Sequence, residues 1–451
     1  MRTANPTWKI ALAIISIIIS LAVWKQGLEQ SFNRPSVAPA LSLSQQEMAL
    51  LAKPAVPRSF QSLLIGTQPE TALRESLMEI PLDQMEDHQR LLLAALENSN
   101  ERKKLLLDFS LEEASLEPVK KVLIEGRNLK DNFEDAFGEE LVYTNPLLIQ
   151  ASCFSIGGNE SNCIDQQIAK RMALRLGFSQ GLPLIALFIG SGLLLRQIWI
   201  LFRGLTLPWP AVIPIPLSSM DMVLLVAGGF VVLGEVVSPT LVLPITSAMT
   251  SQLASPFNES VKVLVGYCSM TVAPLVILSR QLKSLEASLR PENGWLQWRL
   301  SPWNTAISRA IVAWLMVLPP VLITGWLVSF TFGDQGGSNP LLELVLSSRD
   351  PVALGLLVVT TVVLAPLFEE LVFRGVLLPV LVKEIGRSWA LVMSAIVFAM
   401  AHLSVSEFPP LLVLGVGLAL LRLSTGRLLP CVLMHALWNG MTFFNLVLLA
   451  G

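Results

Sequence analysis

The chain has few charged residues for its length. Only 15% of its 451 residues are Asp, Glu, Lys or Arg, whereas soluble domains average about 25%. Hydrophobic residues make up 53% of the sequence, and the mean hydropathy is +0.60. This composition excludes an ordinary soluble protein and predicts an integral membrane protein. The net charge of -2 leaves no basic excess, which argues against a nucleic-acid partner.

Cysteine is also scarce. Four cysteines, with no CxxC pair among them, exclude a disulfide-rich scaffold and the usual CxxC metal or redox motifs. Cys268 and Cys431 lie in apolar segments, where we expect them only to pack. Cys153 and Cys163 bracket a polar stretch, and they form either a disulfide, if that stretch is exported, or two free thiols.

Long apolar runs are abundant, and several approach the length that a bilayer requires. The first has basic flanks and no small-residue cleavage site after it, so we interpret it as a retained anchor. The sequence predicts an all-α, polytopic transmembrane helical bundle of about nine spans. The nine predicted spans are Ile10–Trp24, Leu182–Phe202, Met222–Leu243, Val261–Leu278, Ile307–Phe330, Val352–Leu367, Trp389–His402, Leu411–Leu421 and Leu428–Leu449.

The distribution of polar residues divides the chain into four parts. Residues 1–24 are the predicted N-terminal anchor, and residues 25–177 form a charged, mainly helical extramembrane domain. Residues 178–345 carry additional spans, and residues 346–451 carry spans with polar motifs. We find no internal repeat.

Lysine and arginine concentrate in alternate short loops, which indicates the orientation of the spans. The basic loops follow the second, fourth, sixth and eighth spans. They contain Arg196, Arg203, Arg280, Lys283, Arg290, Arg299, Lys383, Arg387, Arg422 and Arg427. This pattern predicts a cytoplasmic N-terminus and places the 25–177 domain on the non-cytoplasmic side. The architecture suggests a bacterial plasma membrane or an internal photosynthetic membrane.

Polar residues recur inside the last predicted spans, where they are costly and usually functional. Glu370 and Arg374 are four residues apart, so they share a helix face in the favourable order for an ion pair. Glu369 points about 100° away. A buried ion pair that locks two helices would explain Glu370 and Arg374, but not a second carboxylate beside them. Glu369 is therefore the candidate that takes a proton from water.

Three more polar residues lie on the following spans. His402 ends one span, and His435 and Asn439 are four apart on the last, so they share a face. The chain has only three histidines in total. A lone histidine on an apolar helix usually only packs, but two of them with two glutamates and an asparagine supply a base, an orienting group and donors for an oxyanion.

A zinc site is the alternative chemistry. The sequence has no HExxH, so the commonest zinc-protease geometry is absent. Glu369, His402 and His435 from separate helices would still be a possible ligand set with an open position.

The three motifs together resemble the CPBP family, which comprises CAAX prenyl proteases of the Rce1 type and bacteriocin-processing or immunity proteins. Its pattern of EExxxR, FxxxH and HxxxN matches Glu369 to Arg374, Phe398 to His402 and His435 to Asn439. The resemblance covers roughly Pro351 to Leu449, and the 25–177 domain resembles nothing known in the family.

The resemblance implies an intramembrane glutamate-dependent endopeptidase whose substrate is a membrane-anchored peptide or protein in the lipid bilayer. Glu369 would activate water with the assistance of His402, while His435 and Asn439 would stabilise the oxyanion. Glu370 and Arg374 would hold the site. This mechanism requires no cofactor, although the family is often described as metalloproteases.

Two other functions compete with this interpretation. One is a catalytically silent membrane scaffold or immunity-type protein, in which the constellation is only a polar lock. The other is a proton-coupled transporter that uses Glu235 and the histidines as a relay, but the internal repeat expected of many transporters is not found.

Overall fold

A computed structural model describes residues 7–34, 37–107, 109–125, 141, 144–205, 208–333 and 340–449 of the chain. All the secondary structure in these ranges is helical. Contacts divide the chain into two units, one of residues 38–184 and one of residues 1–37 together with 185–450. We call them the small unit and the membrane unit.

The small unit is built from short helices around an aliphatic core. Its largest fully buried side chains include Leu73, Leu77, Leu91, Leu106 and Leu116. The helices are α2 (Ala38–Ala52), α3 (Arg58–Leu64), α4 (Pro69–Met78), α5 (Asp87–Leu96), α6 (Ser99–Leu107), η1 (Ala114–Leu116), α7 (Glu117–Glu125), α10 (Pro146–Ser155), α11 (Glu160–Cys163), α12 (Gln166–Leu176) and η2 (Gly177–Gly181).

A disulfide joins Cys153 and Cys163 in the small unit, so the first of the two alternatives for this pair holds. The bond links the end of α10 to α11. Gly158 lies directly against it, because a Cβ at this position would be 2.4 Å from both sulfur atoms.

The membrane unit consists of long apolar helices. They are α1 (Thr7–Asn33), α13 (Leu182–Phe202), α14 (Ser219–Val223), η3 (Leu224–Val237), α15 (Ser238–Thr250), α16 (Phe257–Lys283), η4 (Ala287–Leu289), α17 (Trp303–Phe332), α18 (Pro340–Ser347), α19 (Pro351–Val358), η5 (Val359–Leu364), α20 (Ala365–Glu370), η6 (Leu371–Leu377), α21 (Leu378–Ile385), α22 (Arg387–Met400), α23 (Phe408–Thr425) and α24 (Leu429–Leu449).

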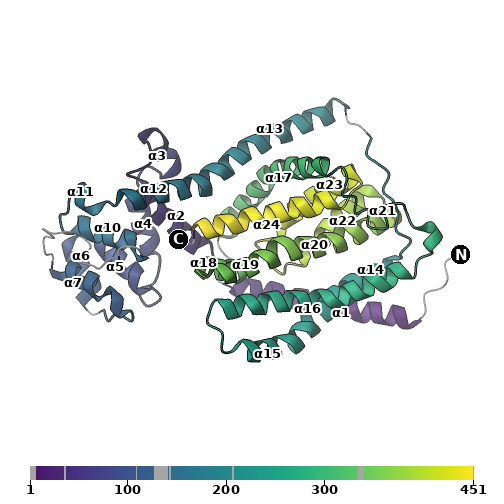
Figure 1. Ribbon diagram of the computed structural model, residues 1–451, viewed down its shortest axis with the longest axis horizontal. Coiled ribbons are helices and arrows are strands. Elements are labelled where there is room, and N and C mark those ends of the chain that lie inside the picture. The colour runs from purple at the N-terminus through teal and green to yellow at the C-terminus, as the bar shows by residue number, and fades with distance from the viewer. Residues whose placement is uncertain are drawn as a thin grey trace. The chain divides into compact units, whose positions relative to one another are not determined.

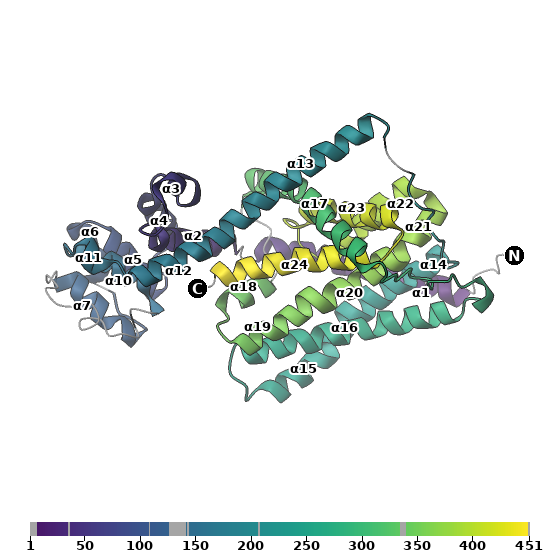
Figure 2. The same cartoon turned by 45° about the horizontal axis from the view of Figure 1, so that its top comes forward.

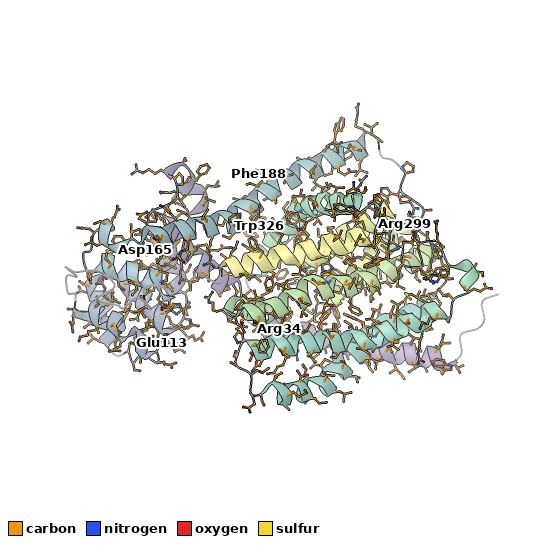
Figure 3. The ribbon with its side chains drawn as sticks, viewed as in Figure 1. Arg34, Glu113, Asp165, Phe188, Arg299 and Trp326 are labelled. Atoms are coloured by element: carbon orange, nitrogen blue, oxygen red, sulfur yellow. A yellow bond between two sulfur atoms is a disulfide. The ribbon has the colours of Figure 1, made fainter. Side chains whose placement is uncertain are left out.

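Eight helical runs in the described residues are long and apolar enough to cross a membrane. The remaining predicted span, Trp389–His402, corresponds to α22, which has only 14 residues and at about 1.5 Å per residue is shorter than the hydrocarbon core. The surface agrees with this assignment, since Phe188 and Trp326 project from the membrane unit while Glu113 and Asp165 lie on the small unit (Figure 3). The chain is a multi-pass membrane protein with a polytopic helical bundle.

Helices α17, α22, α23 and α24 pack against one another in the membrane unit, and α16 packs on η3, α15 and α19 (Figures 1 and 2). The run α19–η5–α20–η6–α21 contacts both groups, because α19 lies on α16 and α20 lies on α24. Polar side chains of this central run can therefore meet groups from helices on either side.

Prolines explain the local geometry of these spans. Each π-helical segment of the described residues (η2, η3, η5 and η6) ends two residues before a proline, namely Pro183, Pro239, Pro366 and Pro379. Proline has no N–H and its ring clashes with the carbonyl four residues earlier. The preceding turn widens to i→i+5 hydrogen bonds, and the helix continues without a break. The run Pro351–Ile385 is therefore one continuous helix of 35 residues that contains two such segments.

Candidate active site

The two glutamates lie in the short α-helical turn α20, between the π-helical segments η5 and η6. Pro366 lies in the first turn of α20 and Pro379 in the first turn of α21. Such π-helical insertions are rare in proteins and are frequent at functional sites.

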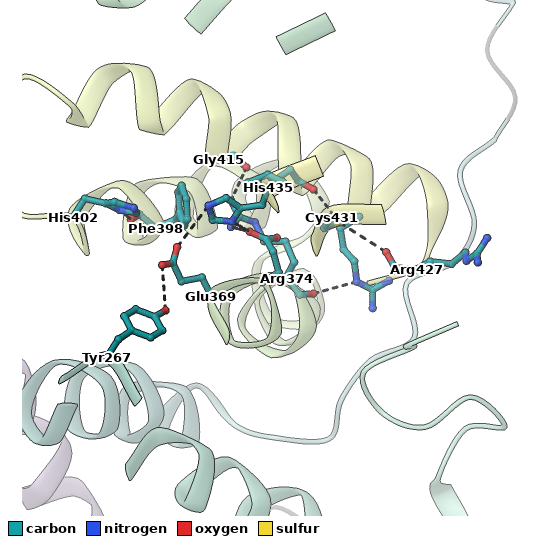
Figure 4. Close-up of polar contacts among 12 residues, drawn as sticks. Tyr267, Glu369, Arg374, Phe398, His402, Gly415, Arg427, Cys431 and His435 are labelled. Atoms are coloured by element: carbon teal, nitrogen blue, oxygen red, sulfur yellow. Dashed lines mark hydrogen bonds and ion pairs between the residues drawn. The ribbon is translucent and has the colours of Figure 1, made fainter. Parts of the chain in front are cut away.

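Glu370, Arg374 and His435 form a fully buried hydrogen-bonded group (Figure 4). Arg374 Nη1 donates to Glu370 Oε1 at 2.8 Å, as the spacing of four residues predicts. His435 Nδ1 lies 2.9 Å from the same oxygen. A carboxylate oxygen only accepts, so His435 donates from Nδ1 to Glu370, and its Nε2 is directed away from that carboxylate.

Glu369 reaches the other side of the same imidazole. Its Oε2 lies 3.9 Å from His435 Nε2, and its side chain is 15% exposed. Glu369 and Glu370 thus approach opposite nitrogens of His435 from neighbouring positions on one helix. The Glu370 carboxylate is held by Arg374, and the Glu369 carboxylate is not. Two carboxylates in such different environments are expected to have different chemical roles.

A tyrosine that the sequence interpretation did not consider also contacts Glu369. Tyr267 Oη on α16 donates to Glu369 Oε1 at 3.5 Å (Figure 4). Tyr267 is one of only two tyrosines in the chain, and this rarity is the only signal in the sequence that pointed to it.

His402 lies near this group, but among the described residues no hydrogen bond or ion pair joins it to Glu369. Its Nδ1 donates to the carbonyl of Phe398 at 2.9 Å. The Phe398 ring lies against both imidazoles, with centroid distances of 4.9 Å to His402 and 5.6 Å to His435. Because Nδ1 is used in this contact, Nε2 is the ring nitrogen of His402 that can meet other partners.

Asn439 holds α24 to the central run. Its Nδ2 donates to the carbonyl of Thr361 at 2.8 Å, and Thr361 lies in η5. This contact uses one of the two amide hydrogens, and the second remains for another acceptor.

Arg374 has further contacts besides Glu370. Its Nη2 donates to Gly415 O at 3.1 Å, and its guanidinium lies 4.3 Å from the centre of the Phe398 ring. Gly415 permits the close approach of α22 and α23, since a Cβ there would lie 3.1 Å from the Cα of Ala395. Arg422 in turn donates to the carbonyl of Arg374 at 3.1 Å. The sequence motifs included neither Gly415 nor Arg422.

The zinc alternative requires Glu369, His402 and His435 to meet at one point, but among the described residues no hydrogen bond or ion pair joins His402 to Glu369. Within the described residues, no group of three His, Cys, Asp or Glu side chains has the arrangement of a metal site. His435 Nδ1 is bonded to Glu370, and the Phe398 ring contacts both imidazoles. We derive no step through a zinc ion at these residues.

Glu235, the residue of the transporter alternative, is half-buried on η3. It lies close enough to Glu369 for the two carboxylates to interact electrostatically. A second carboxyl group in this position adds to the polarity of the Glu369 side of the site.

Comparisons with known families match two segments of the chain. Residues 351–441 match the family described as type II CAAX prenyl endopeptidase Rce1-like, a family of proteases. Residues 38–174 match a domain of unknown function (DUF8675). No curated protein and no solved structure matches the chain. The resemblance found in the three motifs is thus confirmed.

Proposed function

Residues 351–441 are a domain of the type II CAAX prenyl endopeptidase Rce1-like family, and from this premise we propose that the chain is an intramembrane endopeptidase. It hydrolyses a peptide bond of a membrane-borne protein or peptide with water activated by Glu369. The observation that carries the proposal is the pairing of Glu369 with His435, whose other nitrogen is held by Glu370.

Glu369 is the general base. The 3.9 Å between its Oε2 and His435 Nε2 is too long for a direct hydrogen bond, but it allows one water molecule to contact both atoms. Glu369 takes a proton from this water as its oxygen attacks the carbonyl carbon of the scissile bond. The proton is later delivered to the leaving amine.

His435 stabilises the tetrahedral intermediate. In this proposal the Nε2 of His435 already carries a proton before the water is activated, so its N–H donates to the oxyanion, and the positive charge of the ring is compensated by Glu370. Arg374 holds Glu370 in place and thereby fixes the orientation of the ring. Asn439 offers its second amide hydrogen to the same oxyanion, and His402 assists Glu369 in the proton transfers through its free Nε2.

The predicted orientation enters the proposal as well. The small unit lies on the non-cytoplasmic side, which suits a disulfide between Cys153 and Cys163 because disulfides persist in oxidising compartments. Substrates that are membrane-anchored reach the site from the bilayer.

Glu369→Gln tests the proposal. This variant keeps the size of the side chain but removes the base, and loss of a positioned acid–base group costs about 10²–10⁴ in rate. Comparison of the membrane peptides of cells that carry the wild type or Glu369→Gln should show cleavage products only with the wild type, and it names the substrates.

Glu343→Gln is the matched control, because Glu343 is an exposed glutamate of α18, outside the site. It should retain wild-type cleavage. Unchanged cleavage by a folded, inserted Glu369→Gln protein would contradict the proposal and favour the silent scaffold. In the same assay, loss of cleavage on treatment with a zinc chelator, restored by zinc, would contradict the metal-free mechanism.

A further inference from the structure

Tyr267 approaches Glu369 from a helix that lies outside the family match. It belongs to α16 (Phe257–Lys283), whereas the match begins at residue 351. Its hydroxyl contacts Glu369 Oε1, and Glu369 Oε2 faces His435 Nε2. The two carboxylate oxygens of the proposed base therefore have different partners. Oε2 points at the imidazole of His435, and Oε1 accepts from the hydroxyl of Tyr267.

The packing of the Tyr267 ring against other aromatic side chains supports the contact between its hydroxyl and Glu369. The ring lies edge-on to Phe368, the residue before Glu369, with a centroid distance of 6.4 Å. Phe368 in turn stacks on Phe230 of η3 at 5.8 Å. The Tyr267 ring thus packs against Phe368, the residue next to Glu369, and this packing restricts its motion.

Tyr267 also borders a cavity of about 390 Å³. The walls are apolar, and they come from α16 and from the helical run that carries Glu369, including Phe368 and Leu371 on either side of the two glutamates. The volume is within the usual range of ligand-binding cavities. The Tyr267 hydroxyl therefore lies at the boundary between an apolar space and the carboxylate.

We propose that Tyr267 is a positioning residue for Glu369. Its hydroxyl donates to Oε1 and so directs Oε2 and its lone pairs toward the space beside His435, where the water is activated. Without this donor, the half-buried carboxylate loses one restraint on rotation about its last side-chain bond, and the productive orientation is less populated. The inference rests on the proposed role of Glu369 as the base.

The first experiment requires no substrate. The carboxylate stretching band of Glu369 is obtained by infrared difference spectroscopy of the full-length protein in lipid, with Glu369→Gln as the reference. Tyr267→Phe removes only the hydroxyl and keeps the ring against Phe368, and it should shift this band. Thr271→Val is the matched control, because Thr271 lines the same cavity one turn along α16 and its hydroxyl donates to Cys268 O, with no other hydrogen bond to the described part of the chain. It should leave the band in place.

The second experiment uses a substrate named by the peptide comparison. Tyr267→Phe should lower kcat about tenfold, as expected for loss of one hydrogen bond to a charged group, and change KM less than twofold. Thr271→Val should change neither.

The two experiments separate this inference from the proposed function. An unshifted infrared band in Tyr267→Phe overturns the inference even if Glu369 proves essential, and so does a shift of equal size in Thr271→Val. A shifted band with unchanged kcat also overturns it, since the contact then has no effect on the reaction. Retained cleavage in Glu369→Gln contradicts the proposed function instead.

Discussion

The two units each bury an arginine, and they satisfy it differently. In the small unit, Arg102 donates to the backbone carbonyls of Ala94, Glu97 and Ser155 at 3.0–3.2 Å. In the membrane unit, Arg374 donates to Gly415 O and to the carboxylate of Glu370. Because the partners of Arg102 are backbone carbonyls, its hydrogen-bond network extends to no other side chain of the described residues. The Glu370 carboxylate instead extends the network of Arg374 to the imidazole of His435.

The difference teaches how a structural buried charge is distinguished from one that serves a site. Both arginines are buried, and both connect elements that are distant in the sequence. Only Arg374 belongs to a chain of ionisable groups that ends at a half-buried carboxylate, Glu369. Burial alone would not distinguish Arg374 from Arg102.

The largest effect is expected from replacement of Arg374, the buried arginine of the membrane unit. Arg374→Met leaves Glu370 buried without its cation, which costs about 3–5 kcal/mol of stability and abolishes cleavage. Arg374→Lys should not rescue cleavage, because a single ammonium cannot reproduce the two directed donors. Unfolding of the protein in detergent and peptide cleavage are the measurements.

Arg102→Met is the counterpart in the small unit. It should lower the stability of that unit by about 1–3 kcal/mol, through carbonyls left without donors, and leave the rate of cleavage by the folded protein unchanged. Equal loss of cleavage in both variants would show that the two arginines do not differ in role.

The next effect concerns the covalent link of the small unit. Replacing both Cys153 and Cys163 by serine removes a bond between residues ten apart in the sequence, which stabilises by about 3 kcal/mol in the chain-entropy model. Hydrogen exchange of α10, α11 and α12 should become faster, while exchange in α20 and α24 of the membrane unit stays the same. Faster exchange throughout both units would contradict the separation of the two.

The smallest expected effect is a pH-dependent change in the stability of the small unit, and it comes from a buried carboxyl group. Burial of Glu47 in α2, with the nearby charge of Glu86, raises the pKa of Glu47 to about 7 from 4.5. A carboxyl with a raised pKa in the folded state stabilises below pH 4.5, and this contribution is lost as the pH rises through 7. Glu47→Gln should therefore stabilise the small unit at pH 8 by about 1–2 kcal/mol, after allowance for its partial exposure.

The full-length protein is the sample, and hydrogen exchange of α2 at pH 5 and pH 8 is the measurement. Glu86→Gln tests the second cause, because it removes the like charge and should lower the pKa of Glu47. A wild type that is equally protected at both values of pH would contradict this account.

The sequence was sufficient for the helical spans and for the pair of Glu370 and Arg374, because apolar length and a spacing of four residues act locally. It also brought the motifs of three spans into one expected site. The contacts themselves depend on tertiary packing. His435 meets both glutamates, whereas His402 is hydrogen-bonded to the backbone of its own helix.

Tyr267 and Thr361 show why the remainder was not predictable. Tyr267 is 102 residues from Glu369, and a tyrosine in an apolar span is ordinarily taken as an interface aromatic. The bond from Asn439 to the carbonyl of Thr361 depends on the π-helical segment before Pro366. The spacing rules for side chains on a regular α-helix do not include that segment.

The widened turn before Pro366 makes the site sensitive to the length of its own helix. Removal of a single residue from Val359–Leu364 would turn everything on one side of the deletion by about 100° relative to the other. Both acids would then face different neighbours, although the composition and hydropathy of the segment would barely change. Point substitutions at Thr360 or Val362 are consequently far safer than insertions or deletions, and homologous proteins that differ in length within this turn should have lost the reaction.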